Sequence, residues 1–545
     1  MTLLRGPPLP PPRHQTLQRA LAAAAASPTG LSFLDAQEQE RGLPFSELYA
    51  RAQRLAWSLQ AIGVLPGDRV AMVLPTSLDF MDAFFGTLLA GAVPVPLYPP
   101  VRLGRLEEFH DRTARMLTTV GARLLLSDAR ISRLLGVVTG RARPALGLHR
   151  VSDLFEDSRG DLALPGAPED LAVIQFSSGT TLDPKPVALS HRNVLANASA
   201  IDTFLPEDLA VPQSGVSWLP LYHDMGLIGC LLLAILHPGD MTLMSPEVFL
   251  ARPALWLRAI SKKRATISVA PNFAFGLCAK RIRDEELEGV DLSSWTLALN
   301  GAEPIAPVVL QRFADRFAKF GFDPRALTPV YGLSEASLAV TFTPRLRGPR
   351  VVRAVSVGTP IPGIEVRVER GRIEVRGPSV MRRYFGRDHD AVSPEGWLDT
   401  GDLGFIEDGE LFVSGRAKDL VILRGKNHAP QEFEDALDGL GGVRAGCAIA
   451  VAVPGEEGEE LALLVERERE GALEEEAVRV RVLERTGIRA QVVRLLEPGT
   501  LPRTSSGKLR RSEGRRQLLA GELRPPDKVT ALRMAGELLR SWLHS

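Results

Sequence analysis

The residues best suited to chemistry lie in two stretches, far apart in the chain, that combine hydroxyl side chains, glycine and a lysine. The first runs from Ser177 to Lys185 and the second from Thr504 to Lys508. Nucleotide phosphates are bound by several converging donors on a backbone with little steric bulk. The residues of the first stretch that meet this need are Ser177, Ser178, Gly179, Thr180, Thr181 and Lys185. Their spacing differs from the Walker pattern, so we expect a phosphate site of another kind.

Two further segments place polar residues directly after an apolar run of strand type, one at 301–303 and one at 331–335. Loops at such positions are where α/β sheets bind ligands. In the second segment Tyr331 could stack on a purine, and the carboxylate of Glu335 could bind Mg²⁺ as a hard oxygen ligand. The residues of these segments are Gly301, Ala302, Glu303, Tyr331, Gly332 and Glu335.

A histidine lies in the stretch Ser217–Gly229, where His223 is followed by Asp224. A histidine beside an aspartate is often a structural hydrogen-bonded pair. Here an apolar helical segment follows at once, so the polar cluster could also mark the mouth of an apolar tunnel.

These segments, in this order, resemble the adenylate-forming superfamily, and the similarity extends over roughly residues 45–512. Acyl-CoA synthetases, luciferases, adenylation domains and fatty acyl-AMP ligases belong to it. Three stretches are most similar to fatty acyl-AMP ligases: Val93–Pro100, Ser217–Gly229 and Lys418–Glu432. The resemblance implies that Lys508 is a catalytic lysine carried by a separate, mobile domain.

The resemblance also implies a role for the other candidates. His223 would lie beside the substrate carboxylate, and Gly226–Leu236 would help to line an acyl pocket. The backbone of Gly301–Glu303 would contact adenine, and Glu335 would bind Mg²⁺. The remaining implied roles are ribose binding for Asp402, ribose or phosphate binding for Arg416, and a hinge at Lys418.

The implied reaction converts ATP and a carboxylic acid, expected to be a fatty acid, into acyl-AMP and pyrophosphate. A thiol then accepts the acyl group. The first expectation for the acceptor is the phosphopantetheine of an acyl carrier protein, and the alternative is coenzyme A. The segment from Glu335 to Gly358 is short, as in CoA ligases, and leaves this choice open. A third alternative is an inactive nucleotide-binding scaffold, because Leu182 and Pro186 replace usual glycines.

The composition narrows the possible partners and the compartment. Lys plus Arg and Asp plus Glu each number 65, so the formal net charge is zero and predicts no binding to nucleic acid. The three cysteines, Cys230, Cys278 and Cys447, have no metal or disulfide spacing, which suits the cytoplasm. No apolar run is long enough for a transmembrane segment.

The predicted fold class is α/β. Apolar runs such as 69–74, 91–97 and 171–176 alternate with helical patterns, which predicts parallel sheets covered by helices. Ser190 is expected to cap a helix. The alternation at 365–369 and 372–376 predicts a β-rich subdomain. The expected parts are a flexible segment (1–30), a large adenylating domain (31–416), a small mobile α+β domain (417–523) and a helical tail (524–545).

Overall fold

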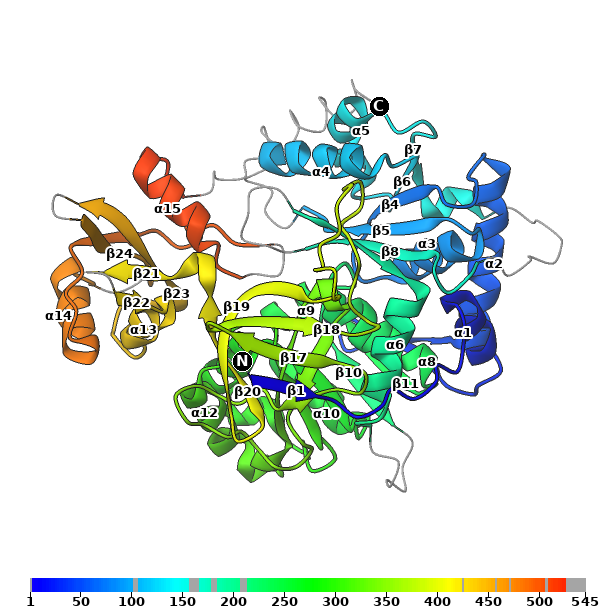
Figure 1. The fold of residues 1–545 in the computed structure, drawn as a ribbon. Helices are drawn as coiled ribbons and strands as arrows, with labels where there is room; N and C mark the ends of the chain where they lie inside the picture. Colours follow the sequence, from blue (N-terminus) through cyan, green and yellow to red (C-terminus); the bar gives the residue numbers. More distant parts are fainter. Residues whose placement is uncertain are drawn as a thin grey trace.

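The computed structural model describes residues 2–100, 106–155, 166–177, 184–205, 213–423, 426–455, 458–469, 472–504 and 508–525. Parallel strands with covering helices form the body of the protein, as the α/β class predicts (Figure 1). The yellow-to-red elements of the C-terminal part form a separate lobe beside this body.

In the largest sheet of the described residues, the strands lie in the order β16-β15-β14-β13-β12-β10-β11-β2-β3. The central strands from β14 to β2 are parallel, and antiparallel strands close both edges. Their bounds are β2 Gly30–Leu34, β3 Glu40–Pro44, β10 Ser214–Ser217, β11 Asp240–Met244, β12 Ile267–Ala270, β13 Leu297–Asn300, β14 Leu327–Gly332, β15 Ala339–Phe342 and β16 Thr359–Pro360. The central strands are short apolar runs because helices bury both faces.

A second, fully parallel sheet has the order β5-β4-β6-β7, and the antiparallel pair β8-β9 lies beside β5. The bounds are β4 Arg69–Val73, β5 Val93–Leu97, β6 Leu124–Ser127, β7 Leu148–Arg150, β8 Leu171–Phe176 and β9 Pro186–Ser190. The strands expected at 69–74, 91–97 and 171–176 are therefore present. The connection between β8 and β9 is the hydroxyl-rich stretch that begins at Ser177.

The helices of the body begin at recognisable caps. Ser77 accepts a hydrogen bond from Phe80 N at the start of α3, and Ser190 forms a capping box with Asn193 at the start of α6, as the sequence predicts. The helices of the body are α1 Leu17–Ala24, α2 Phe45–Ala61, α3 Leu78–Leu89, α4 Leu106–Val120, α5 Gly136–Ala142, α6 His191–Asp202, α7 Asp224–Gly226, α8 Leu233–Leu236, α9 Pro246–Ala251, α10 Ala254–Lys262, α11 Asn272–Arg281 and α12 Pro307–Phe317.

The β-rich subdomain is an antiparallel sheet with the order β1-β17-β18-β19-β20. The bounds are β1 Thr2–Arg5, β17 Glu365–Glu369, β18 Arg372–Arg376, β19 Leu398–Glu407 and β20 Glu410–Arg416. The two strands expected from the alternation are present with the predicted ends. β19 and β20 lead directly to the short turn Ala417–Asp419, after which the chain enters the C-terminal lobe.

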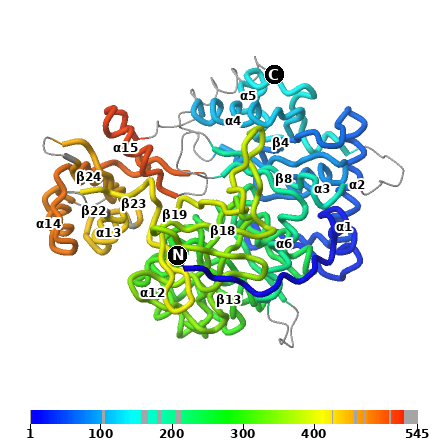
Figure 2. Tube along the Cα trace, in the orientation of Figure 1, coloured from blue at the N-terminus to red at the C-terminus, as the bar shows by residue number. Residues whose placement is uncertain are grey.

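The expectation that residues 1–30 form a loose segment is wrong. The N-terminal segment runs beside the antiparallel sheet (Figures 1 and 2), and β1 extends this sheet by pairing with β17. In the register of this pair, Leu4 lies opposite Val366. After a proline-rich connection, Thr16 caps α1, whose Leu17 and Leu21 are buried against the body. The apolar residues of this segment are therefore held by partners far away in the sequence.

The C-terminal lobe has a sheet in the order β23-β24-β25 and a small β21-β22 pair. Its elements are β21 Val421–Leu423, β22 Lys426–His428, α13 Pro430–Glu434, β23 Val443–Gly455, β24 Gly458–Arg467, α14 Glu475–Thr486, β25 Val492–Leu496 and α15 Arg511–Ala520. Separate apolar clusters cover the two faces of its sheet, one around Phe433 and Leu463 and the other around Ile449 and Leu464. The lobe thus has a core of its own. Residues 526–545, which include most of the expected helical tail, lie outside the described residues.

Within the described part of the chain, no helix is both long and apolar enough to cross a membrane. Cys230, Cys278 and Cys447 are buried free thiols, as their spacing predicts.

Candidate functional site

A cleft of about 2880 Å³ lies between the body and the C-terminal lobe. Most of the residues singled out from the sequence face it: Ser177, Lys185, Ala302, Glu303, Tyr331, Gly332, Glu335, Asp402, Arg416, Lys418 and Lys508. Ser178, Gly179, Thr180 and Thr181 lie outside the described residues, as does Leu182. The structure therefore brings together segments that span most of the chain.

The hydroxyl-rich stretch is held at both ends by the β8–β9 pair. Ser177 N donates to the carbonyl of Lys185 at 2.9 Å, and Phe176 lies opposite Pro186 in the strand register. The carbonyl of Pro186 accepts a hydrogen bond from Phe385 N at 2.8 Å. Pro186 thus begins a strand, a position that tolerates proline.

The loops after β13 and β14 reach the cleft because these parallel strands end at the same edge of the sheet. Gly332 allows a very close approach there, since a Cβ atom would lie 1.7 Å from the carbonyl oxygen of Leu338. Ala302 has a left-handed backbone with φ of 71°. The carboxylate of Glu303 accepts a hydrogen bond from Phe273 N at 2.5 Å, so this side chain caps the start of α11.

Asp402 connects the large sheet with the last strand before the C-terminal lobe. Tyr331 donates its hydroxyl to Oδ2 of Asp402 at 2.7 Å, and Arg416 Nε donates to Oδ1 at 2.9 Å. Burial and the negative charge of Asp402 raise the pKa of Tyr331, so the phenol stays protonated and remains a donor. Each carboxylate oxygen keeps a second lone pair, so Asp402 can still accept a hydrogen bond from a ligand.

Glu335 follows β14 in the short turn Ser334–Ala336. Its Oε1 atom accepts a hydrogen bond from the hydroxyl of Tyr384 at 2.9 Å. The ring of Tyr384 also faces Lys185, whose Nζ lies 4.9 Å from the ring centroid. These contacts join the carboxylate after β14 to the end of the hydroxyl-rich stretch.

Asp224 is a site residue that the sequence reasoning did not single out. It lines the cleft and accepts a hydrogen bond from the hydroxyl of Ser334 at 2.5 Å. Burial alone would raise its pKa, but the neighbouring His223, together with Ser334, lowers the pKa of Asp224 to about 2. The sequence feature that could have identified Asp224 is its position directly after His223, at the start of α7.

His223 lies next to the cleft. Its Nδ1 atom lies 3.8 Å from Oδ1 of Asp224, and it lines a small cavity of about 10 Å³ that shares Tyr98, Ser177 and Tyr222 with the lining of the main cleft. The main cleft is lined instead by Asp224 and Met225. His223 thus contacts the cleft through the carboxylate of Asp224, and its role beside the substrate carboxylate stays a prediction.

Lys508 enters the cleft from the C-terminal lobe. The turn that carries it is closed by two hydrogen bonds with Thr504, one of which joins Thr504 N to the carbonyl of Lys508 at 2.8 Å. Burial and the charge of Arg416 lower the pKa of Lys508, while Asp224 acts in the opposite direction. Lys508 is half-buried and lines the cleft, although it belongs to the C-terminal lobe.

Four of the cations that line this cleft come from the segments singled out in the sequence, namely Lys185, Arg416, Lys418 and Lys508. Burial lowers the pKa of Lys418, and the charges of Arg416 and Lys185 lower it further. A cluster of this kind fits a polyanion such as a nucleotide triphosphate.

The described residues contain no group of three or more metal-ligating side chains. Mg²⁺ is commonly held by one carboxylate together with substrate phosphates and water, and Glu335 can supply that carboxylate.

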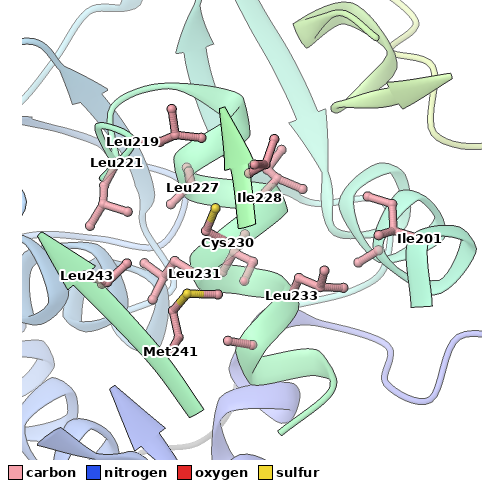
Figure 3. Packing of buried hydrophobic residues seen from close by; sticks show 14 of the residues in the cluster. Ile201, Leu219, Leu221, Leu227, Ile228, Cys230, Leu231, Leu233, Met241 and Leu243 are labelled. Atoms are coloured by element: carbon pink, nitrogen blue, oxygen red, sulfur yellow. The ribbon is translucent and has the colours of Figure 1, made fainter. Parts of the chain in front are cut away.

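The lining of the cleft includes an apolar group of residues, called the apolar arm below: Ile201, Gly229, Leu233, Leu338 and Phe342. Gly229 and Leu233 lie one turn apart, and the intervening chain is the π-helix Leu227–Leu232, labelled η4. Its other side chains pack into the core with Met241 and Leu243 (Figure 3). One face of the expected Gly226–Leu236 segment therefore lines a cavity, and π-helical turns often occur at functional sites.

The arginines that follow Lys508 in the sequence make contacts within the protein. The side chain of Arg510 is 5% exposed and lies 3.8 Å from Glu108 of α4. Arg511 forms two hydrogen bonds with Glu434, at 2.7 and 2.6 Å, and Arg515 donates to the carbonyl of Ala452. Arg516 pairs with Glu513 and Glu522. These four arginines thus have partners within the protein.

Comparisons with known proteins agree with this geometry. The family model described as AMP-binding enzyme matches residues 21–385. A protein of Caulobacter vibrioides, provisionally named an acyl-CoA synthetase, is 36% identical over 93% of this chain and 96% of its own length. A long-chain-fatty-acid–AMP ligase of Mycobacterium marinum is 34% identical over 89% of this chain and 93% of its own. A solved structure from a study of fatty acyl-adenylate ligases of E. coli and L. pneumophila has a TM-score of 0.86 and 33% identity, and covers 94% of this chain and 99% of that one.

Proposed function

Because the chain belongs to the AMP-binding enzyme family, we propose that it is an ATP-dependent ligase that activates a fatty acid as acyl-AMP and then transfers the acyl group to a thiol. The observation that carries this proposal is the convergence of four cations and Glu335 on one cleft with an apolar arm. The cations suit the phosphates of ATP, and the arm suits an alkyl chain. The named relatives act on fatty acids, which agrees with the apolar lining.

The first step is an in-line attack of the carboxylate on the α-phosphorus of ATP, which forms acyl-AMP and releases pyrophosphate. The protein contributes mainly by positioning the reactants and by neutralising charge that develops in the transition state. Asp402 accepts hydrogen bonds from the ribose hydroxyls, and Arg416 keeps Asp402 in place. Lys508 donates to the oxygens that gain charge. Mg²⁺, held through Glu335, would neutralise part of the phosphate charge.

The second step uses the C-terminal lobe in another orientation. Its present contacts with the body include Lys280 to Glu468 at 3.3 Å and Arg510 to Glu108 at 3.8 Å. The Lys280–Glu468 pair is exposed on both sides, and exposed ion pairs contribute little stability, so its loss does not prevent a rotation. Lys418 lies in the turn between the last strand of the body and the lobe, and acts as the hinge. Rotation removes Lys508 from the cleft and opens it to a thiol.

The proposed acceptor is the phosphopantetheine thiol of an acyl carrier protein. The similarity to proteins named as fatty-acid–AMP ligases supports this choice. Coenzyme A is the second candidate, and a specific observation favours it. The connection between β15 and β16 is short, and Ser356 and Arg350 hold it against Glu410 at 2.7 and 3.2 Å. This connection therefore contains no long insertion that would block rotation of the C-terminal lobe.

A competition experiment tests the acceptor. Enzyme, ATP, Mg²⁺ and a panel of fatty acids would be incubated with equal concentrations of coenzyme A and a holo-carrier protein encoded near the enzyme, and the products identified by mass spectrometry. We expect acyl-carrier protein as the main product, and none with the apo-carrier that lacks phosphopantetheine. Rapid acyl-CoA formation without carrier acylation would contradict the first choice and support the second.

A further inference from the structure

Tyr384 occupies a position between two groups of the proposed nucleotide site. We propose that Tyr384 is a positioning residue that orients the Glu335 carboxylate for Mg²⁺ and couples it to Lys185 at the phosphates. This inference rests on the proposed role of Glu335 as the magnesium ligand.

The hydroxyl of Tyr384 donates to Oε1 of Glu335 at 2.9 Å, while its ring faces Lys185 Nζ at 4.9 Å from the centroid. A carboxylate on a flexible side chain can rotate freely unless a donor fixes one oxygen. When one oxygen accepts a hydrogen bond, the direction of the second oxygen is also fixed. Partners that orient a metal ligand in this way commonly affect metal affinity about 10- to 100-fold.

The segment that carries Tyr384 is fastened to both sides of the site. Met381 N donates to the carbonyl of Glu335 at 2.8 Å. On the other side, Tyr384 forms a β-bridge with Val187, and Phe385 N donates to the carbonyl of Pro186 at 2.8 Å. The backbone around Tyr384 therefore spans from the turn of Glu335 to β9, the strand that begins directly after Lys185.

Two further hydrogen bonds hold the preceding residues of this segment. Asn193 of α6 donates to the carbonyl of Pro378 at 2.8 Å, and Ser337 donates its hydroxyl to the carbonyl of Ser379 at 2.8 Å. A tyrosine on a segment fixed at this many points loses little entropy when it orients another side chain. The position of Tyr384 between Glu335 and Lys185 is thus held by contacts within the protein.

The test separates the hydroxyl from the ring. Tyr384→Phe removes only the hydrogen bond to Glu335, and Tyr384→Leu also removes the ring that faces Lys185. For Tyr384→Phe we expect the Mg²⁺ concentration for half-maximal ATP–pyrophosphate exchange to rise about tenfold, with kcat at saturating Mg²⁺ nearly unchanged. For Tyr384→Leu we expect a rise in the KM for ATP in addition, by a few-fold.

A second readout needs no turnover. Mn²⁺ binding to the enzyme with a non-hydrolysable ATP analogue, measured by electron paramagnetic resonance, should weaken about tenfold in Tyr384→Phe, whereas AMP binding without metal stays the same. Tyr49→Phe on α2 removes a hydroxyl outside the cleft and serves as the matched control, with wild-type metal affinity expected. Unchanged Mn²⁺ affinity in Tyr384→Phe would overturn the inference.

The two proposals fail in different ways. If the wild-type enzyme exchanges pyrophosphate with fatty acids but Tyr384→Phe keeps the wild-type metal dependence, only the role of Tyr384 is wrong. If the wild-type enzyme gives no exchange with any acid, the proposed function is wrong, and the Mn²⁺ titration still decides whether Tyr384 orients Glu335.

Discussion

The backbone N–H of Leu17 donates a hydrogen bond to Nδ1 of His191 at 3.2 Å. This contact fastens the N-terminal helix α1 to the first residue of α6, far away in the sequence. It requires an unprotonated Nδ1 atom. Burial accordingly lowers the pKa of His191 to about 4.

This relationship predicts an acid-sensitive stability. The unfolded chain binds a proton at His191 near the ordinary pKa of 6.5, whereas the folded chain does not until about pH 4. The free energy of unfolding should therefore fall as the pH drops from 6.5 to 4. Protonation of His191 alone should account for a decrease of about 3 kcal/mol. Denaturant titrations at a series of pH values would measure it. His191→Gln should give a flatter profile over this range, and an equally steep profile in the variant would contradict the assignment.

The apolar arm predicts a control of acyl chain length at Gly229. A Cβ atom there would lie 2.7 Å from Cδ2 of Leu338, a flexible side-chain end that can move into the arm. Gly229→Val should thus fold but narrow the arm. We expect kcat/KM for long-chain acids to fall about 10- to 100-fold, with short acids much less affected. An equal loss for acids of every length would show that the substitution damages the site in general.

The turn at Lys418 predicts an effect on one half-reaction. Proline fixes φ and resists a rotation about this residue, so Lys418→Pro should slow thiol acylation more than adenylate formation. Single-turnover measurements of the two steps would show it. Lys418→Ala removes the same charge and keeps the backbone free, so it should retain the transfer step. Equal losses in both half-reactions of the proline variant would argue against a hinge.

Local patterns predicted local features well. The alternation at 365–369 and 372–376 gave β17 and β18 with correct ends, and Ser190 was identified as a cap, because these features depend on neighbouring residues. Positions that depend on distant contacts were not predicted. β1 pairs with a strand more than three hundred residues away, and a proline-rich segment gives no local sign of such pairing.

The residues of the candidate site also divide into those that local motifs predict and those that depend on distant contacts. Glu335, Asp402 and Lys508 were found because motifs surround them, and the structure places all three at one cleft. Tyr384 and Asp224 were missed, because their contacts with Glu335 and Ser334 exist only after the sheets have formed. The burial of Arg510 against Glu108 of α4 is likewise a contact between distant segments that the local sequence does not reveal.

The central claim is that this cleft activates a fatty acid at the expense of ATP with the help of Lys508. Fatty-acid-dependent exchange of labelled pyrophosphate into ATP measures this step alone, without any thiol. The wild-type enzyme should show exchange that requires the acid. Lys508→Ala should reduce it by about 100-fold or more, while transfer from supplied acyl-AMP to a thiol continues. Exchange by Lys508→Ala at the wild-type rate, or a wild-type enzyme that exchanges pyrophosphate with no fatty acid, would contradict the account.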